Sequence, residues 1–147
     1  MPVRFLDTNV LLRYLTRDDE DKAQRTFNLL LSIERGEERV ITSSLVIFET
    51  VYTLQSFYKV PRRTIKELLS PIISLRNLQL QSKDVYYRAF DLFISKNISF
   101  ADAYNAAYMI DEEITHIYSW DKDFDKIEGI TRLEPEERRR DDDHINS

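Results

Sequence analysis

Short apolar runs that alternate with longer helical stretches are the feature that most limits how this chain can fold. Runs of this length between polar residues predict strands buried on both faces, and a helix between two strands lets them run in the same direction. The runs lie at residues 3–6, 40–42, 78–80, 116–119 and 130–133, and the helices at 10–15, 19–34, 45–58, from 61, 83–95 and 100–111. The pattern predicts an α/β fold: a three-layer α/β/α sandwich around a central parallel sheet of four to five short strands.

The length and composition fit one domain of ordinary size. The chain has 147 residues, of which 42% are hydrophobic, and this is normal for a globular protein. We expect a single domain over residues 1–133 and a polar, charged tail over residues 134–147, where three arginines precede three aspartates. No apolar run approaches the roughly 20 residues that cross a bilayer, and the first six residues do not resemble a signal peptide. We therefore expect a soluble, cytoplasmic protein.

Several classes of site are excluded by the residues that the chain lacks. It has no cysteine, which rules out disulfides, thiolate zinc sites and a cysteine nucleophile. Its two histidines, His116 and His144, offer little for a histidine-based triad or metal site, and two glycines cannot build a glycine-rich phosphate loop. A net charge of −5 argues against a long nonspecific footprint on nucleic acid but leaves room for a local basic patch. Carboxylates remain as the abundant reactive groups.

Two of these carboxylates directly follow predicted strands. Asp7, in the sequence FLDTNVLL, comes at the end of the first strand, and Asp121, in SWDKDFDK, comes at the end of the fourth. In an open α/β sheet, ligand sites form beyond the carboxyl ends of the strands. Each aspartate could instead only cap the helix that follows it, because such a side chain accepts a free backbone N–H of the first turn.

Two further carboxylates lie on helices that should reach the same edge. Asp102 falls in the first turn of the helix from residue 100, where it could also form a capping box with Ser99. Glu49 lies about one and a half turns inside the helix after the second strand, on an apolar flank, where a carboxylate needs solvent, an arginine or another partner. Four acids that converge without basic partners would repel one another unless they surround a cation. Oxygen-only ligands suit one or two Mg²⁺ or Mn²⁺ ions, which points to phosphoryl chemistry.

These residues in this order resemble the PIN domain, and in length and layout the VapC-type toxins of toxin–antitoxin modules. The resemblance spans about residues 3–133 and depends on FLDTN at the first strand, FE in the helix after the second, FADAYNAA at a helix start and SWDKDF after the next strand. It implies a metal-dependent endoribonuclease whose acidic site is formed by Asp7, Glu49, Asp102 and Asp121. It also implies a homodimer and a cognate antitoxin that holds the enzyme inactive.

The resemblance gives neighbouring residues supporting roles. Thr8, Asn9 and Ser119 would hold the geometry of the site by hydrogen bonds, and Asp123 is the alternative to Asp121 as the fourth acid. The dimer would bury part of the helix from Leu45 to Tyr58 or of the one from Thr64 to Ile73. Basic residues around the acids are candidates for RNA contacts, although surface solubility also explains each of them: Arg13, Arg17, Lys59, Arg62, Arg63 and Lys122.

Three other functions compete with the toxin. A phosphatase with an aspartyl nucleophile is disfavoured because Asn9 stands where its DxDx[TV] motif needs a second aspartate. A binding module that has lost catalysis would keep the repulsion of four acids without benefit. An RNA-processing nuclease without an antitoxin has the same site, and the sequence alone does not separate it from a toxin.

Overall fold

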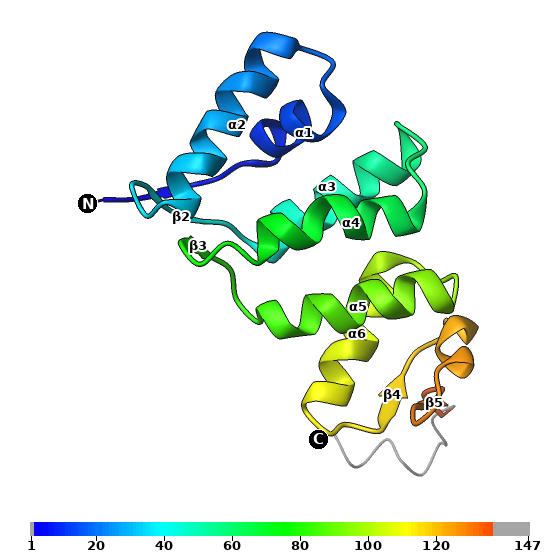
Figure 1. Cartoon of the computed structure of the whole chain (residues 1–147). Helices are drawn as coiled ribbons and strands as arrows, with labels where there is room; N and C mark the ends of the chain where they lie inside the picture. Colours follow the sequence, from blue (N-terminus) through cyan, green and yellow to red (C-terminus); the bar gives the residue numbers. More distant parts are fainter. Residues whose placement is uncertain (1, 137–147) are drawn as a thin grey trace, which may run out of the picture.

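A computed structural model describes residues 2–136, so most of the predicted polar tail, residues 137–147, lies outside the described residues. Within residues 2–136 the chain folds into short parallel strands and longer α-helices (Figure 1), which confirms the α/β class. The strands are β1 (Val3–Phe5), β2 (Arg39–Ile41), β3 (Leu78–Gln79), β4 (His116–Tyr118) and β5 (Thr131–Leu133). The helices are α1 (Thr8–Thr16), α2 (Glu20–Glu34), α3 (Ser44–Ser56), α4 (Arg62–Ile73), α5 (Lys83–Ser95), α6 (Phe100–Asp111) and the 3₁₀ helix η1 (Lys122–Lys126).

Polar side chains fix where several helices begin. Asp19 Oδ1 accepts the backbone N–H of Lys22 at the start of α2, and Ser43 Oγ accepts that of Val46 at the start of α3. These bonds satisfy N–H groups of the first turn, which have no partner inside the helix. Pro61 precedes α4, where its fixed φ suits a helix start and its missing N–H costs nothing. α5 and α6 have the bounds expected from the sequence.

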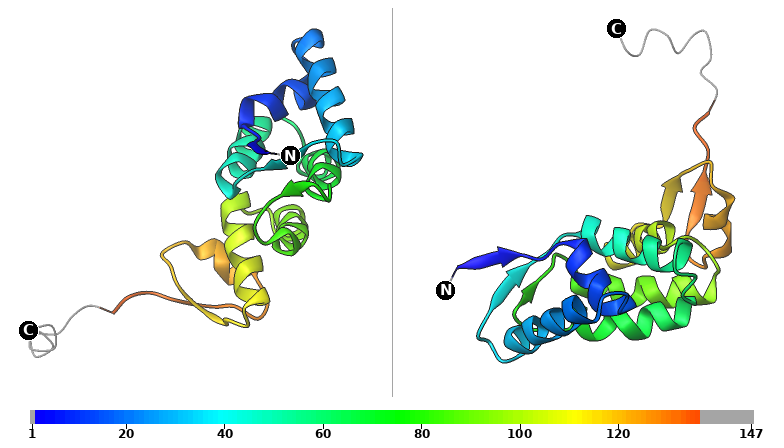
Figure 2. Two further views of the ribbon diagram at one scale, coloured as in Figure 1. Left: turned by 90° about the vertical axis from the view of Figure 1, so that its left-hand side faces the viewer. Right: turned by 90° about the horizontal axis from the view of Figure 1, so that it is seen from above.

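The five strands form two parallel sheets in the described part of the chain, whereas the sequence predicted one central sheet. β1, β2 and β3 pair in that order, with Phe5 opposite Ile41, and β4 pairs with β5, with Tyr118 opposite Leu133. Both views of Figure 2 place β1–β3 and β4–β5 at different ends of the molecule. As a result β1 and β4 each have one edge without a neighbouring strand within residues 2–136.

An aromatic cluster in the core joins α3, α5 and α6. The ring of Phe100 lies 4.9 Å from that of Phe90 and 5.5 Å from that of Phe48, and the Phe48 ring lies 5.0 Å from that of Tyr104. Edge-to-face and tilted aromatic pairs stabilise such a core beyond the area that they bury. Phe90 and Phe93 are fully buried. The cluster fixes the position of α6, and therefore of Asp102, relative to α3.

The strands are less buried than the sequence predicted. Val40 on the central strand β2 and Leu78 on the outer strand β3 are buried as expected, but the side chain of Phe5 is 60% exposed and that of Tyr118 is 73% exposed. The prediction of strands covered on both faces is wrong for Phe5 and Tyr118. No helix among residues 2–136 combines the length and the apolar character needed to span a membrane.

Candidate active site

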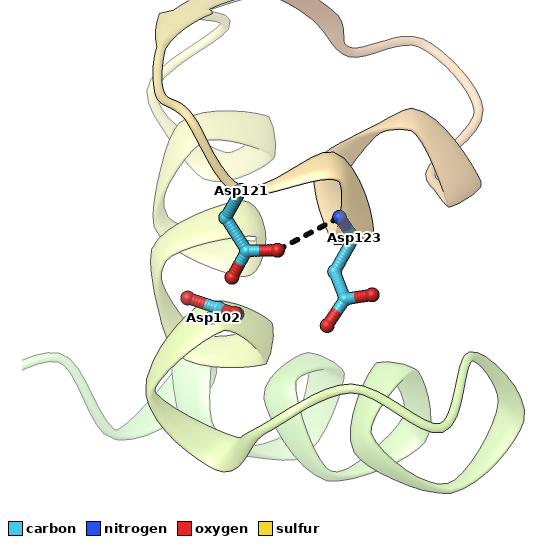
Figure 3. Close-up of side chains that lie close together, drawn as sticks. All are labelled: Asp102, Asp121 and Asp123. Atoms are coloured by element: carbon cyan, nitrogen blue, oxygen red, sulfur yellow. Dashed lines mark hydrogen bonds between the residues drawn. The ribbon is translucent and has the colours of Figure 1, made fainter.

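Three aspartates gather at the start of α6 and the start of η1. Each of Asp102, Asp121 and Asp123 has one carboxylate oxygen within 4.8 Å of an oxygen of the other two. Figure 3 shows the three carboxylates turned toward one another, one from the helix and two from the segment that follows β4. We call this group the aspartate cluster.

Local hydrogen bonds place the members of the aspartate cluster. The Oγ of Ser99 caps α6 by accepting the backbone N–H of Asp102 at 3.1 Å, which holds Asp102 in the first turn. The Oγ of Ser119 accepts the N–H of Asp121 at 3.0 Å, and Oδ1 of Asp121 accepts the N–H of Asp123 at 2.9 Å (Figure 3). The capping roles foreseen for Asp121 and Ser99 therefore exist, and they direct carboxylates to a shared point.

The pKa values of two aspartates in the cluster are shifted in opposite directions. Burial, together with the hydrogen bond and the negative charge of Asp121, raises the pKa of Asp102 to about 6. The backbone N–H of Asp123 and the hydrogen bond with Asp102 lower the pKa of Asp121. The raised pKa shows that a negative charge on Asp102 is disfavoured beside the other carboxylates. A divalent cation would relieve the same repulsion more completely, because it neutralises two charges where a proton neutralises one.

Two cations at the rim belong to this site and were not singled out from the sequence. Lys126 Nζ lies 3.0 Å from Oδ1 of Asp123, one turn along η1. The guanidinium of Arg132 donates to the backbone carbonyl of Ser119 and to the Asp125 carboxylate, which fixes the end of β4 against β5. The i,i+3 spacing of Asp123 and Lys126 is a signal that the sequence offers for the first pair. The contacts of Arg132 depend on the pairing of two strands and have no local signal.

Asp7 and Glu49 form a second, separate acidic pair. Oδ1 of Asp7 accepts the backbone N–H of Thr8 at 2.8 Å, so Asp7 caps α1 directly after β1. The hydroxyl of Thr8 donates to Oε2 of Glu49 on α3 at 3.0 Å. Thr8 therefore connects the two acids. Glu49 is exposed, so its carboxylate reaches solvent as well as the hydroxyl of Thr8.

The structure does not bring all four predicted acids to one point. Within residues 2–136, the group of carboxylates that could hold an ion contains Asp102, Asp121 and Asp123 but neither Asp7 nor Glu49. The reason lies in the sheets: Asp7 follows β1 and Asp121 follows β4, and these two strands are not neighbours in the described chain. Asp123, the sequence alternative to Asp121, lies beside it rather than in its place.

A cationic cavity lies between α1 and α2. Its volume is about 480 Å³, and it is lined by Asn9, Arg13, Lys22 and Arg25 together with apolar residues. Asn9, which was expected to support the acids, is one of the residues that line this cavity. Lys22 and Arg25 were not among the predicted RNA contacts, although their i,i+3 spacing places them on one face of α2.

The six predicted RNA contacts divide into surface and structural residues. Lys59 and Lys122 are exposed. Arg13 pairs with Asp18 at 3.2 Å and Arg17 with Glu20 at 3.7 Å, both near the protein surface. Arg62 is half-buried: its Nη1 donates to the carbonyl of Phe93 at 2.7 Å and to that of Ile98, whereas Arg63 beside it is exposed. The bonds of Arg62 tie α4 to the turn between α5 and α6, so the structure gives this residue a packing role.

Comparison with known proteins identifies the family of this chain. The chain is 25% identical over 135 residues to a protein from Aquifex aeolicus (strain VF5) named VapC ribonuclease, and the alignment covers 92% of this chain and 98% of that protein. The PIN domain family model matches residues 4–130, a range that contains both acidic groups and all of the described helices. This match over most of the chain shows that the protein belongs to the PIN-domain family.

Proposed function

We propose that this protein is a divalent-metal-dependent endoribonuclease that hydrolyses RNA phosphodiesters. The observation that carries the proposal is the aspartate cluster, in which three carboxylates lie within 4.8 Å of one another and the pKa of Asp102 is raised to about 6. Membership of the PIN-domain family and the ribonuclease name of the Aquifex relative support the same activity.

The residues present suit a hard cation. Every ligand on offer is a carboxylate oxygen, the donor that Mg²⁺ and Mn²⁺ prefer. Asp102 and Asp121 would hold one or two such ions with Asp7 and Glu49 completing the acidic set. Asp123 would serve as a further ligand or hold the carboxylate of Asp121 in place through its backbone N–H. When bound, the ion supplies an activated water and stabilises the charge on the leaving oxygen.

The other residues of the site orient the acids. Thr8 fixes the Glu49 carboxylate through its hydroxyl and the Asp7 carboxylate through its backbone N–H. Ser119 fixes the backbone at Asp121 through its Oγ. Such hydrogen bonds maintain the geometry of charged ligands that would otherwise move apart. At a pH near or below about 6, the pKa of Asp102, the ion would displace the proton of that carboxyl, which makes ion binding dependent on pH.

RNA would approach along cations that line the cavity between α1 and α2 or lie on the surface. Arg13, Lys22 and Arg25 line the cavity beside Asn9. Further positive charge near the surface comes from four of the predicted contacts: Arg17, Lys59, Arg63 and Lys122. Phosphate groups bind such side chains by charge-assisted hydrogen bonds. These contacts give affinity without sequence preference, so they leave the choice of RNA target open to other parts of the surface.

We further propose that the protein is the toxin of a toxin–antitoxin module and acts as a homodimer. Leu45, Tyr52 and Phe57, in and directly after α3, are exposed apolar residues, which fits the expectation that this helix contributes to an interface. Helix α4 has less apolar surface available for a dimer interface, because four of its apolar residues are buried in the core of the same chain: Ile65, Leu69, Ile72 and Ile73. The antitoxin would place a basic side chain, such as an arginine, against the carboxylates.

Replacement of one carboxylate tests the enzymatic proposal. Asp102→Asn keeps the shape of the side chain and removes its charge, so cleavage of single-stranded RNA in Mn²⁺ should be lost while the circular dichroism spectrum is unchanged. Asp111→Asn, at the other end of α6, is the matched control and should cleave normally. Full cleavage by Asp102→Asn, or by the wild type in excess EDTA, would refute metal-dependent hydrolysis at this site.

Growth tests separate a toxin from an RNA-processing enzyme. Expression of the wild type should arrest growth, Asp102→Asn should not, and co-expression of the product of the adjacent small gene should restore growth. Harmless expression in the source organism, without a neighbouring gene product that binds the protein, would favour the RNA-processing nuclease.

A further inference from the structure

β1 and β4 are two strand edges that lack a partner within residues 2–136. β1 is the outer strand of the order β1-β2-β3, β4 is paired only with β5, and all of these pairs are parallel. No backbone hydrogen bond joins β1 to β4 in the described chain. Each strand is three residues long, so the two edges match in length.

The side chains at these edges include exposed aromatic and aliphatic groups. Soluble proteins usually protect an open edge with short strands, charged residues, proline or a bulge. β1 is short and carries the exposed charge of Arg4, but the last residue of each strand is aromatic and exposed, Phe5 at 60% and Tyr118 at 73%, and Val3 and Ile41 beside Phe5 are also exposed. A further strand beside each edge would cover these side chains.

The core of the chain places β4 away from β1 of the same molecule. The Phe100 ring packs on Phe48 at 5.5 Å, so the start of α6, the helix that precedes β4, is held on α3. Arg62 of α4 donates to the carbonyl of Phe93 in α5 and to that of Ile98 in the turn before α6. Pairing of β1 with β4 of a second copy needs no change in these contacts.

We propose that β1 of one copy pairs with β4 of a second copy, and the reverse, in a two-fold symmetric dimer. Each dimer then has two five-stranded parallel sheets, and each continues from β3-β2-β1 of one copy into β4-β5 of the other. Because parallel strands present their carboxyl ends at one edge, Asp7 after β1 meets Asp121 after β4 of the second copy. On the proposed nuclease function, each active site is then shared, with Asp7 and Glu49 from one copy and the aspartate cluster from the other.

The surface available for this pairing is appropriate for a dimer. A fully buried aromatic side chain covers about 150–250 Å², so Phe5 and Tyr118 of both copies would together remove on the order of 500 Å² from water. A specific interface buries at least about 1,000 Å², and the neighbouring side chains of Val3, Ile41 and Leu133, also exposed, with the backbones of the strands, supply the remainder.

Complementation between two inactive variants tests the shared site. Asp7→Asn and Asp121→Asn are each expected to lose cleavage, but a mixed dimer has one site in which both aspartates are intact. Refolding the two variants together at equal amounts should restore about a quarter of the wild-type activity, since about half of the dimers are mixed and each has one working site. Asp7→Asn refolded with Glu49→Gln is the matched control, because both changes fall on the same half of the site and no site is complete.

The outcomes distinguish this inference from the nuclease proposal. If the wild type cleaves RNA and the pair Asp7→Asn and Asp121→Asn stays inactive, the site is assembled within one chain and the strand exchange is wrong. If the wild type does not cleave, the nuclease proposal fails, and the exchange is decided by a measurement that needs no activity.

Cross-linking supplies that measurement. The chain contains no cysteine, so the double variant Phe5→Cys/Tyr118→Cys has only the two introduced thiols. Paired strands lie about 4.8 Å apart, within reach of a disulfide. Oxidation should give a covalent dimer of twice the 17.6 kDa chain mass on a non-reducing gel. A disulfide-bonded monomer would show pairing within one chain, and free thiols in both positions would show no pairing at all; either result overturns the exchange.

Discussion

The hydroxyl of Thr8 donates a 3.0 Å hydrogen bond to the carboxylate of Glu49, across a separation of 41 residues in the sequence. Thr8 is the first residue of α1 and Glu49 lies inside α3, so this bond fixes the first strand's end against the third helix. The backbone N–H of the same residue holds Asp7. One residue therefore sets the distance between two acids that we propose as ligands.

Removal of this hydroxyl should weaken the site without unfolding the protein. Thr8→Val keeps the shape of the side chain and frees the Glu49 carboxylate, so we expect about a 10- to 100-fold loss in Mn²⁺ affinity or kcat/KM. Thr8→Ser retains the hydroxyl and should stay near wild type. Titration calorimetry with Mn²⁺ measures the affinity, and equal loss in both variants would assign the effect to packing.

The metal-free protein should become more stable as the pH falls from about 7 toward 4. The pKa of Asp102 is raised from 3.8 to about 6 by burial and by Asp121, so the folded state binds this proton more tightly than the unfolded state. The contribution is present below the unfolded pKa and disappears as the pH rises through about 6, the folded value. Urea unfolding in EDTA across this range should show the slope, and Asp102→Asn should flatten it.

Binding of Mn²⁺ should have the opposite dependence on pH. The ion competes with the proton of Asp102, so its affinity should fall as the pH drops below about 6, the pKa of that carboxyl. Proton release measured by calorimetry in two buffers of different ionisation enthalpy tests this directly. An affinity that stays constant from well above this pKa to well below it would show that the ion does not displace the proton of Asp102.

Arg62 should matter for stability and not for RNA binding. Arg62→Met leaves the carbonyls of Phe93 and Ile98 without this donor, and an unpaired buried acceptor costs about 1–3 kcal/mol. Arg63→Met, exposed on the next position of α4, should change the free energy of unfolding by less than about 0.5 kcal/mol. Urea denaturation compares the two. A larger effect of Arg62→Met on RNA affinity than on unfolding would give Arg62 a role in RNA binding after all.

The cavity between α1 and α2 should contribute to RNA affinity. Lys22→Gln and Arg25→Gln remove positive charge from the lining of the cavity. Each is made in the Asp102→Asn variant, which does not cleave RNA, and each should weaken the binding of single-stranded RNA. The slope of log affinity against log salt should become smaller by about 0.7 for each phosphate that is no longer neutralised. Arg88→Gln, on α5, is the control of equal charge change. Unaltered slopes in the cavity variants would remove these residues from the RNA path.

The helices could be predicted from the sequence because their signals are local. The period of apolar residues together with Ser99 as a cap gives the bounds of α6, and α5 was found from its apolar period. The candidate acids at the starts of α6 and η1 followed from the same local patterns: Asp102 lies in the capped first turn, and Asp121 closely follows a strand.

The division of the strands could not be predicted in this way. The order of the strands depends on contacts between residues that are distant in the sequence. The sequence of β1 does not indicate that its neighbour is β2 and not β4. The separation of Asp7 and Glu49 from the aspartate cluster follows from that pairing. The position of Asp123 likewise depends on the tight 3₁₀ turn of η1, which brings a residue two places after Asp121 back to the same point.

The spread of the acidic residues along the chain, from Asp7 to Asp123, affects what happens during translation. A chain is synthesised and begins to fold from its N-terminus, so Asp7 and Glu49 leave the ribosome early. The aspartate cluster is complete only when Asp123 has emerged and η1 has folded against the start of α6. A chain interrupted before that point, by a stalled ribosome or a premature stop codon, therefore lacks the acidic site, and such a partial product should leave the RNA of its host intact.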